Sequence, residues 1–344
     1  MRIQPKRIMC AIDFSEFTRE ILDYSIAFCK TFHAKLFLVH IVDDANASLI
    51  YSEVVIAKER LIEEHTSNAR NLLLDLISGV KVETEIVISF GDPADEISKL
   101  ALREKIDVVI SATHGQSGIK RFLIGSVTEK LIKTLHCPVL VLRTENKERL
   151  PADIDNLKLK KIMVGCDFSP DSKHAFDYGL SLAQEFQADL YLVHVIKPTE
   201  HIELKASDYI KVFPGDYVQW VTTDYYEMQQ KVTEENREKI EKLRSNLTKQ
   251  LLYMLPEESQ AWCTPHTILL SGEPYKELVS FAKGQEVDII VLGIRGHTLW
   301  EKLMVGSTTD RVIRHTHCPV LAVRQTDAEK SILPGTVNTE ETLL

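Results

Sequence analysis

The sequence predicts an α/β protein built from two tandem, open, five-stranded parallel sheets with helices on both faces. Short apolar runs rich in β-branched residues alternate with longer stretches of helical periodicity. This alternation is typical of parallel sheets, because each crossover helix covers one face of the sheet. The whole pattern occurs twice in 344 residues, a length that is long for one core and comfortable for two domains.

In the first copy, five strands are expected to alternate with four helices. The strands are expected at 8–12, 36–42, 82–88, 108–110 and 138–142. The helices are expected to open at Ser15 with Glu16, to cover 52–76, to follow Pro93 and to begin at Ser126. Right-handed crossovers place the loops that follow the strands at one edge of the sheet, where sheets of this kind bind ligands.

The second copy repeats the first. Asp167-Phe168-Ser169 repeats Asp13-Phe14-Ser15, and His317-Cys318-Pro319-Val320-Leu321 repeats His136-Cys137-Pro138-Val139-Leu140. Counterparts lie 154 positions apart up to the second strand and 181 apart from Gly272 onward, so the second copy holds 27 additional residues between its second and third strands. We therefore expect a domain at 1–143, a linker at 144–157, a second domain at 158–325 with an aromatic-rich insertion near 197–226, and a disordered tail at 326–344.

The composition excludes several classes of function. A formal net charge of −9 argues against nucleic acid or an anionic membrane as the main partner. The six cysteines show no Cys-x-x-Cys spacing, which favours buried free thiols in a reducing compartment over disulfides or a metal site. The chain starts with a basic turn and a strand rather than a signal peptide, and no stretch is apolar enough to span a membrane. A cytoplasmic location is therefore expected.

A glycine-rich loop follows the fourth strand of the second copy. Gly293 and Gly296 lie three residues apart, and Gly306-Ser307 follows after nine intervening residues. Glycines at these offsets let backbone N–H groups approach a phosphate. Ser307 is expected to cap the next helix, with Asp310 in the reciprocal capping position. The first copy has the same spacing at Ala112, Gly115, Gly125 and Ser126.

This glycine spacing resembles that of the ATP-binding members of the universal stress protein family. Other features of that family stand in both copies: an aspartate after the first strand, a Val-His pair at the end of the second and a His-Cys-Pro-Val-Leu fifth strand. The resemblance covers nearly the whole chain. It implies a Rossmann-like sheet of the adenine nucleotide alpha hydrolase type, with strand order 3-2-1-4-5. It also implies pairing of the two fifth strands, which here makes an intramolecular pseudo-dimer.

The resemblance further implies an ATP site in each copy, with Mg²⁺ held through the phosphates. In the second copy the implied site residues are Asp167, Val195, Leu292, Gly293, Gly296, Gly306, Ser307 and Thr308. In the first copy they are Asp13, Ile41, Ala112, Gly115, Gly125, Ser126 and Val127. The aspartate would contact the adenosine, the residue after the histidine would meet adenine, and the glycines and serine would hold phosphate and ribose.

Four positions keep alternative interpretations. His40 and His194 could act as bases, but a side chain satisfied locally at a strand end is the better expectation. Arg295 could neutralise phosphate or be a solvated loop cation. Ala112 would be strained if the glycine at its counterpart position had a positive φ, and harmless if the backbone there were extended. The first interpretation of Ala112 predicts that the second domain binds ATP at least as tightly as the first.

The sequence favours a binding module over an enzyme. It has no Gly-x-x-x-x-Gly-Lys-Ser/Thr loop, no set of kinase motifs and no evident base for an attacking water, so we assign no catalytic residue and no protein metal ligand. The alternatives are a slow ATPase or nucleotidyl transferase on the same fold, and a nucleotide-free scaffold. A homodimer that uses the aromatic insertion is also expected.

Overall fold

A computed structural model describes residues 3–43, 55–113, 124–143, 157–197, 221–295 and 305–325. Several predictions fall outside these ranges: the roles of Gly115 and Gly296, nearly all of the 144–157 linker, most of the 197–226 insertion with its proposed dimer contact, and the 326–344 tail. Among the described helices, none has a stretch long and apolar enough to cross a membrane.

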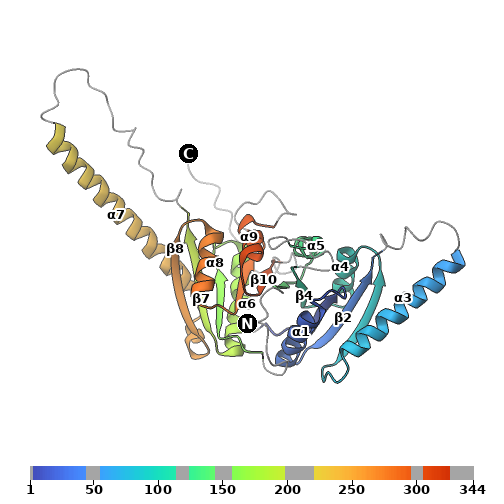
Figure 1. The fold of residues 1–344 in the computed structure, drawn as a ribbon. Helices are drawn as coiled ribbons and strands as arrows, with labels where there is room; N and C mark the ends of the chain where they lie inside the picture. Colours follow the sequence, from blue (N-terminus) through green and yellow to red (C-terminus); the bar gives the residue numbers. More distant parts are fainter. Residues whose placement is uncertain are drawn as a thin grey trace, which may run out of the picture.

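Each half follows the predicted alternation of strands and helices (Figure 1). The first half consists of β1 (Arg7–Ile12), α1 (Thr18–Phe32), β2 (Lys35–Val42), α3 (Val55–Leu76), β3 (Thr84–Phe90), α4 (Pro93–Arg103), β4 (Val108–Ala112), α5 (Ser126–Thr134) and β5 (Val139–Leu142). The second half consists of β6 (Lys161–Gly165), α6 (Pro170–Phe186), β7 (Asp189–Ile196), α7 (Val221–Met254), the 3-10 helix η4 (Glu257–Ala261), β8 (Thr264–Ser271), α8 (Pro274–Gly284), β9 (Ile289–Gly293), α9 (Ser307–His315) and β10 (Val320–Val323).

The strand order is β3-β2-β1-β4-β5-β10-β9-β6-β7-β8, so each half has the predicted order 3-2-1-4-5. The prediction of two sheets needs a correction, because β5 and β10 pair antiparallel and join the halves into one ten-stranded sheet. The predicted pairing of the fifth strands is thereby confirmed, with Leu140 opposite Leu321. Both strands are fully buried, and their pairing removes two apolar edges that would otherwise be open to aggregation.

The apolar core lies in two layers, one on each face of the sheet. Alternating strand residues point to opposite faces, so Ile8 and Cys10 lie in one layer while Met9 lies in the other. Helices α1, α3, α6 and α7 contribute to the first layer, and α4, α5, α8 and α9 contribute to the second (Figure 1). Both layers hold residues from both halves, and Phe32 of α1 meets Phe186 of α6 with ring centroids 6.2 Å apart. The halves therefore share a continuous core.

Helix α1 does not begin where its sequence predicts. In the second half Ser169 caps α6 by accepting a hydrogen bond from the Ser172 N–H, and Pro170 occupies the first turn. In the first half, α1 begins only at Thr18, and its N-cap residue makes no side-chain hydrogen bond. The helix start predicted at Ser15 is therefore wrong: the Ser15 N–H donates to the Asp13 carboxylate in a turn before the helix.

All six cysteines are free and buried, as expected from their spacing. Burial raises the pKa of Cys10, Cys137 and Cys166 to about 12, which leaves almost no thiolate at neutral pH. We therefore predict that an aromatic disulfide reagent titrates fewer than one thiol per native chain within minutes and all six after denaturation in guanidinium. Rapid native reaction of any one thiol would contradict the burial.

Candidate functional site

A cavity of about 500 Å³ opens at the carboxyl edge of the first half. It is lined by the ends of β1, β2 and β4 and by the first turn of α5. Six of the seven first-half residues predicted to bind nucleotide line it: Asp13, Ile41, Ala112, Gly125, Ser126 and Val127. The seventh, Gly115, lies outside the described residues. The sequence pattern thus identified residues that the fold brings together around one hollow.

The turn that carries the aspartate has the same geometry in both halves. The Ser15 N–H donates to Asp13 Oδ1 at 3.0 Å, and the Ser169 N–H donates to Asp167 Oδ1 at 3.0 Å. In each half the residue between the aspartate and the serine is a phenylalanine with a positive φ, 58° at Phe14 and 63° at Phe168. A bulky residue rarely adopts this conformation, so the surrounding structure must hold it. The turn is therefore held in place by the fold, and in the first half it sets Asp13 in the lining of the cavity.

The two histidines hold these turns. His40 Nδ1 lies 2.9 Å from the Ile12 carbonyl oxygen, and His194 Nδ1 lies 2.7 Å from the Cys166 carbonyl oxygen. A carbonyl oxygen can only accept, so Nδ1 carries the proton in each ring. Burial lowers the pKa of His40, which keeps that ring neutral near pH 7. The expectation of a locally satisfied side chain is confirmed for both.

The helices that follow the glycine loops begin without a side-chain cap. Gly125 and Gly306 are themselves the N-cap residues of α5 and α9. Ser307 is therefore the first helical residue, and the capping role predicted for it is wrong. The predicted reciprocal role of Asp310 is also wrong, because its carboxylate binds the Arg314 guanidinium at 2.8 Å. In the first half, the uncapped turn lies against the cavity with its N–H groups and the positive end of the helix dipole.

A buried threonine ties each of these helices to the strand before it. Thr128 donates to the Ala112 carbonyl oxygen at 2.6 Å, and Thr309 donates to the Gly293 carbonyl oxygen at 2.7 Å. These threonines hold the first turn of α5 and α9 beside the end of β4 and β9. The sequence reasoning did not single them out, although their separation of 181 positions marks them as counterparts.

In the second half, the remaining predicted residues converge at the equivalent edge. Strand β6 pairs with β7 on one side and with β9 on the other. The turn at Asp167 therefore follows a strand that lies between β7, which carries Val195 next to its last residue, and β9, which ends with Leu292 and Gly293. Ser307 and Thr308 stand in the first turn of α9. Gly296 lies outside the described residues.

Gly293 is required for close packing rather than for a positive φ. Its φ lies outside the left-handed region. A Cβ atom there would lie 2.7 Å from the backbone of Asp171 and from that of Ser172, in the first turn of α6. The alternative in which Ala112 is strained is therefore wrong, and the predicted advantage of the second domain loses its basis. In the first half, α1 begins two positions later than α6 does in matched numbering, and Ala112 holds its methyl group buried.

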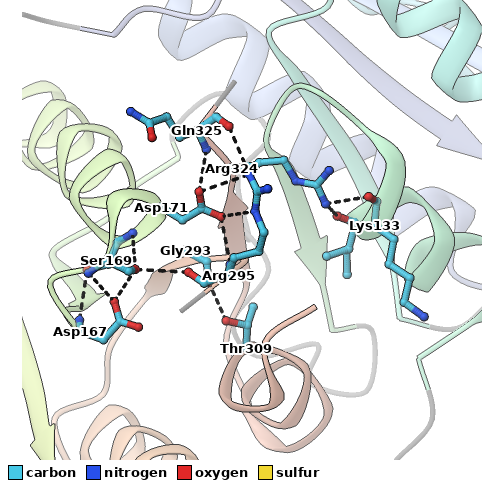
Figure 2. A network of polar contacts seen from close by, with 11 residues as sticks. Lys133, Asp167, Ser169, Asp171, Gly293, Arg295, Thr309, Arg324 and Gln325 are labelled. Atoms are coloured by element: carbon cyan, nitrogen blue, oxygen red, sulfur yellow. Dashed lines mark hydrogen bonds and ion pairs between the residues drawn. The ribbon is translucent and has the colours of Figure 1, made fainter. Parts of the chain in front are cut away.

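Arg295 has a third role that neither of its two interpretations included. Its backbone N–H, Nε and Nη2 donate to the Asp171 carboxylate at 3.0, 3.1 and 3.5 Å (Figure 2). The Asp171 side chain is only 6% exposed, so the pair is largely shielded from water. Gln325 closes the cluster by donating from its N–H to Asp171 and accepting from Arg295. The guanidinium is thus engaged with the Asp171 carboxylate and the Gln325 backbone of its own half.

The sequence of the first half does not repeat this pair of charges, because its counterparts of Asp171 and Arg295 are Phe17 and His114. Asp171 was missed because an acid in the first turn of a helix is usually a solvated partner of the helix dipole. Its signal was the divergence between the two copies at this position.

The fold and the site define a class: two α/β halves of Rossmann type, each with an aspartate turn after its first strand and, after its fourth strand, a helix that begins without a side-chain cap. The sequence profile of the universal stress protein family matches residues 5–143 and 158–324. The chain therefore belongs to the universal stress protein family, as a tandem member.

Curated relatives match one half at a time. Universal stress protein MJ0577 of Methanocaldococcus jannaschii is 33% identical over 164 residues, covering 42% of this chain and 99% of the relative. Universal stress protein MJ0531 of the same organism is 29% identical over 171 residues, covering 49% of this chain and 85% of the relative. A universal stress protein structure from Archaeoglobus fulgidus spans both halves, with a TM-score of 0.61, 18% identity and coverage of 94% and 99%. That likeness shows the fold alone.

Proposed function

We propose that this protein is a nucleotide-responsive binding module of the stress response and that each half binds ATP. The observation that carries the proposal is the first-half cavity, with Asp13 from one strand end and the uncapped N-terminus of α5 both in its lining. Its volume of about 500 Å³ lies within the range of ordinary small-molecule sites. A carboxylate and an open helix N-terminus complement a ribose and a phosphate chain.

Each group has a chemical task in this proposal. The Asp13 carboxylate accepts hydrogen bonds from ribose hydroxyls or a base amino group. Ile41 and Ala112 supply apolar wall against the base, as their place in the lining allows. The backbone N–H groups at Ser126 and Val127 face the phosphates, where the helix dipole favours negative charge. Gly125, with no side chain, allows the close approach that these N–H groups need.

Mg²⁺ is proposed to arrive with the nucleotide. Within the described residues, no group of three or more His, Cys, Asp or Glu side chains could hold a metal ion. The phosphates would therefore supply the negative charge that holds the Mg²⁺ ion. The bound ion would in turn offset part of that negative charge. We propose binding without turnover, because the sequence has no phosphate loop with its lysine, no set of kinase motifs and no evident base for an attacking water.

The test is binding by the full chain. We expect an adenine nucleotide to be released when freshly purified protein is denatured and analysed by mass spectrometry. Titration of stripped protein with ATP and Mg²⁺ in a calorimeter should give two sites per chain. A stripped protein that gives no heat and releases no nucleotide would make the chain a scaffold. Release of ADP and phosphate over many turnovers would favour the enzyme alternative.

A further inference from the structure

Matched arginines leave the fifth strand of each half and cross into the other half. Arg324 follows β10, and its Nη2 donates to the carbonyl oxygens of Ile132 at 3.2 Å and Lys133 at 2.6 Å, in the last turn of α5 (Figure 2). Arg143 follows β5, and its Nη1 donates to the carbonyl oxygens of Arg314 at 2.6 Å and Thr316 at 2.8 Å, at the end of α9. The arrangement is reciprocal.

These contacts satisfy groups that a helix leaves open. The last four carbonyls of an α-helix have no partner within the helix, and a cation beside them also complements the negative end of the dipole. Both arginine side chains are partly buried, and burial lowers the pKa of Arg324 from its usual value. A guanidinium is not deprotonated in proteins, so Arg324 is charged where it anchors α5.

The helices that receive the arginines are the ones that present the candidate phosphate contacts. Helix α5 has nine residues and is about 14 Å long, so one end cannot tilt without moving the other. Thr128 fixes its N-terminal turn to its own half, and Arg324 fixes its C-terminal turn to the opposite half. Thr309 and Arg143 do the same for α9. The position of each N-terminus is thus set partly from across the join.

In the second half, a chain of polar contacts connects the turn at Asp167 with the neighbour of Arg324. Ser169 Oγ lies 2.5 Å from Asp167 Oδ1 and 3.2 Å from the Arg295 carbonyl oxygen, so its one proton has two acceptors within reach. Arg295 is paired with Asp171, and both bind the backbone of Gln325, the neighbour of Arg324 (Figure 2). A ligand that changes the hydrogen bonding of Asp167 therefore acts on a cluster that ends at the α5 anchor.

We propose that Arg324 and Arg143 are positioning residues, each for the candidate nucleotide site of the opposite half. The inference rests on the proposed function of these sites. It makes the two sites of one chain interdependent, because each half holds the phosphate-binding helix of the other.

The experiment uses the full chain with one site silenced. Gly306→Val leaves the first-half site to be titrated with ATP and Mg²⁺, and Gly125→Val leaves the second. Arg324→Gln should weaken the first-half site by roughly fivefold or more, the lower end of measured couplings between sites, and change the second less than twofold. Arg143→Gln should do the reverse. Arg324→Lys should recover part of the loss, because an ammonium can reach one carbonyl.

A second measurement needs no nucleotide. Amide hydrogen exchange of the ligand-free protein should speed up in α5 for Arg324→Gln and in α9 for Arg143→Gln, with each opposite helix unchanged. A wild-type chain that binds no ATP would refute the proposed function and, with it, this inference. Binding by the wild type with equal losses at both sites, losses only in the arginine's own half, or no losses at all would overturn the inference alone.

Discussion

Valine in place of Gly306 should abolish ATP binding in the second half while the protein keeps its fold. The N-cap backbone has φ −56° and ψ 138°, a conformation that valine adopts without strain. A branched side chain at this position would, however, prevent the phosphates from reaching the N–H groups of the first turn. We expect a loss of roughly 100-fold or more, since two or more charge-assisted hydrogen bonds would be lost.

Gly125→Val is the matched variant in the first half. The N-cap backbone there has φ −59° and ψ 144°, and a Cβ atom would lie 3.4 Å from the Thr113 carbonyl oxygen, an ordinary contact. Calorimetry of each single variant should show one remaining ATP site, and the double variant should show none. Thermal unfolding should be close to that of the wild type in all three. A folded double variant that still binds ATP with unchanged affinity would contradict the assignment of both nucleotide sites.

The fold could be predicted because its signal is local and repeated. Parallel strands that are buried on both faces are continuous apolar runs in the sequence. Each of these runs and motifs also occurs twice, at an offset of 154 or 181 positions, so the second copy supports the interpretation of the first. The pairing of β5 with β10 followed from strand order, since each would otherwise be an open apolar edge. The single ten-stranded sheet was missed because the two halves were considered as separate domains, whereas their edges continue one hydrogen-bonded ladder.

The polar cluster could not be predicted, because its members are brought together only by the tertiary fold. Asp171 and Arg295 lie 124 positions apart, and nothing near either residue in the sequence indicates the other. The start of α1 was missed for a different reason. Ser15 and Glu16 form a plausible local helix start, but Asp13 takes the Ser15 N–H and the left-handed Phe14 breaks the helical geometry. The turn at Asp13, rather than local capping by Ser15, therefore sets where α1 begins.

Alanine in place of Gly293 should destabilise the protein, although the matched position of the first half already holds an alanine. The added methyl group would lie 2.7 Å from backbone atoms of Asp171 and Ser172, and backbone in the first turn of a buried helix cannot yield as a side-chain tip can. We expect the free energy of unfolding to fall by about 1–3 kcal/mol, as in overpacked cores. Displacing Asp171 would also loosen its ion pair with Arg295.

Ala112→Gly is the control, because it makes the reverse exchange at the counterpart position. It removes a buried methyl group and adds chain entropy to the unfolded state, so a loss of about 1 kcal/mol or less is expected.

Urea denaturation followed by tryptophan fluorescence and circular dichroism would measure both variants, and the double variant would show whether the effects add. If Gly293→Ala were as stable as the wild type, the close packing of α6 on β9 would not be the reason for the glycine. If instead the double variant recovered stability, the two halves would be adjusting to each other through the shared core. We expect simple addition, because Gly293 packs against the first turn of α6 in its own half, whereas Ala112 lies at the end of β4 in the other half.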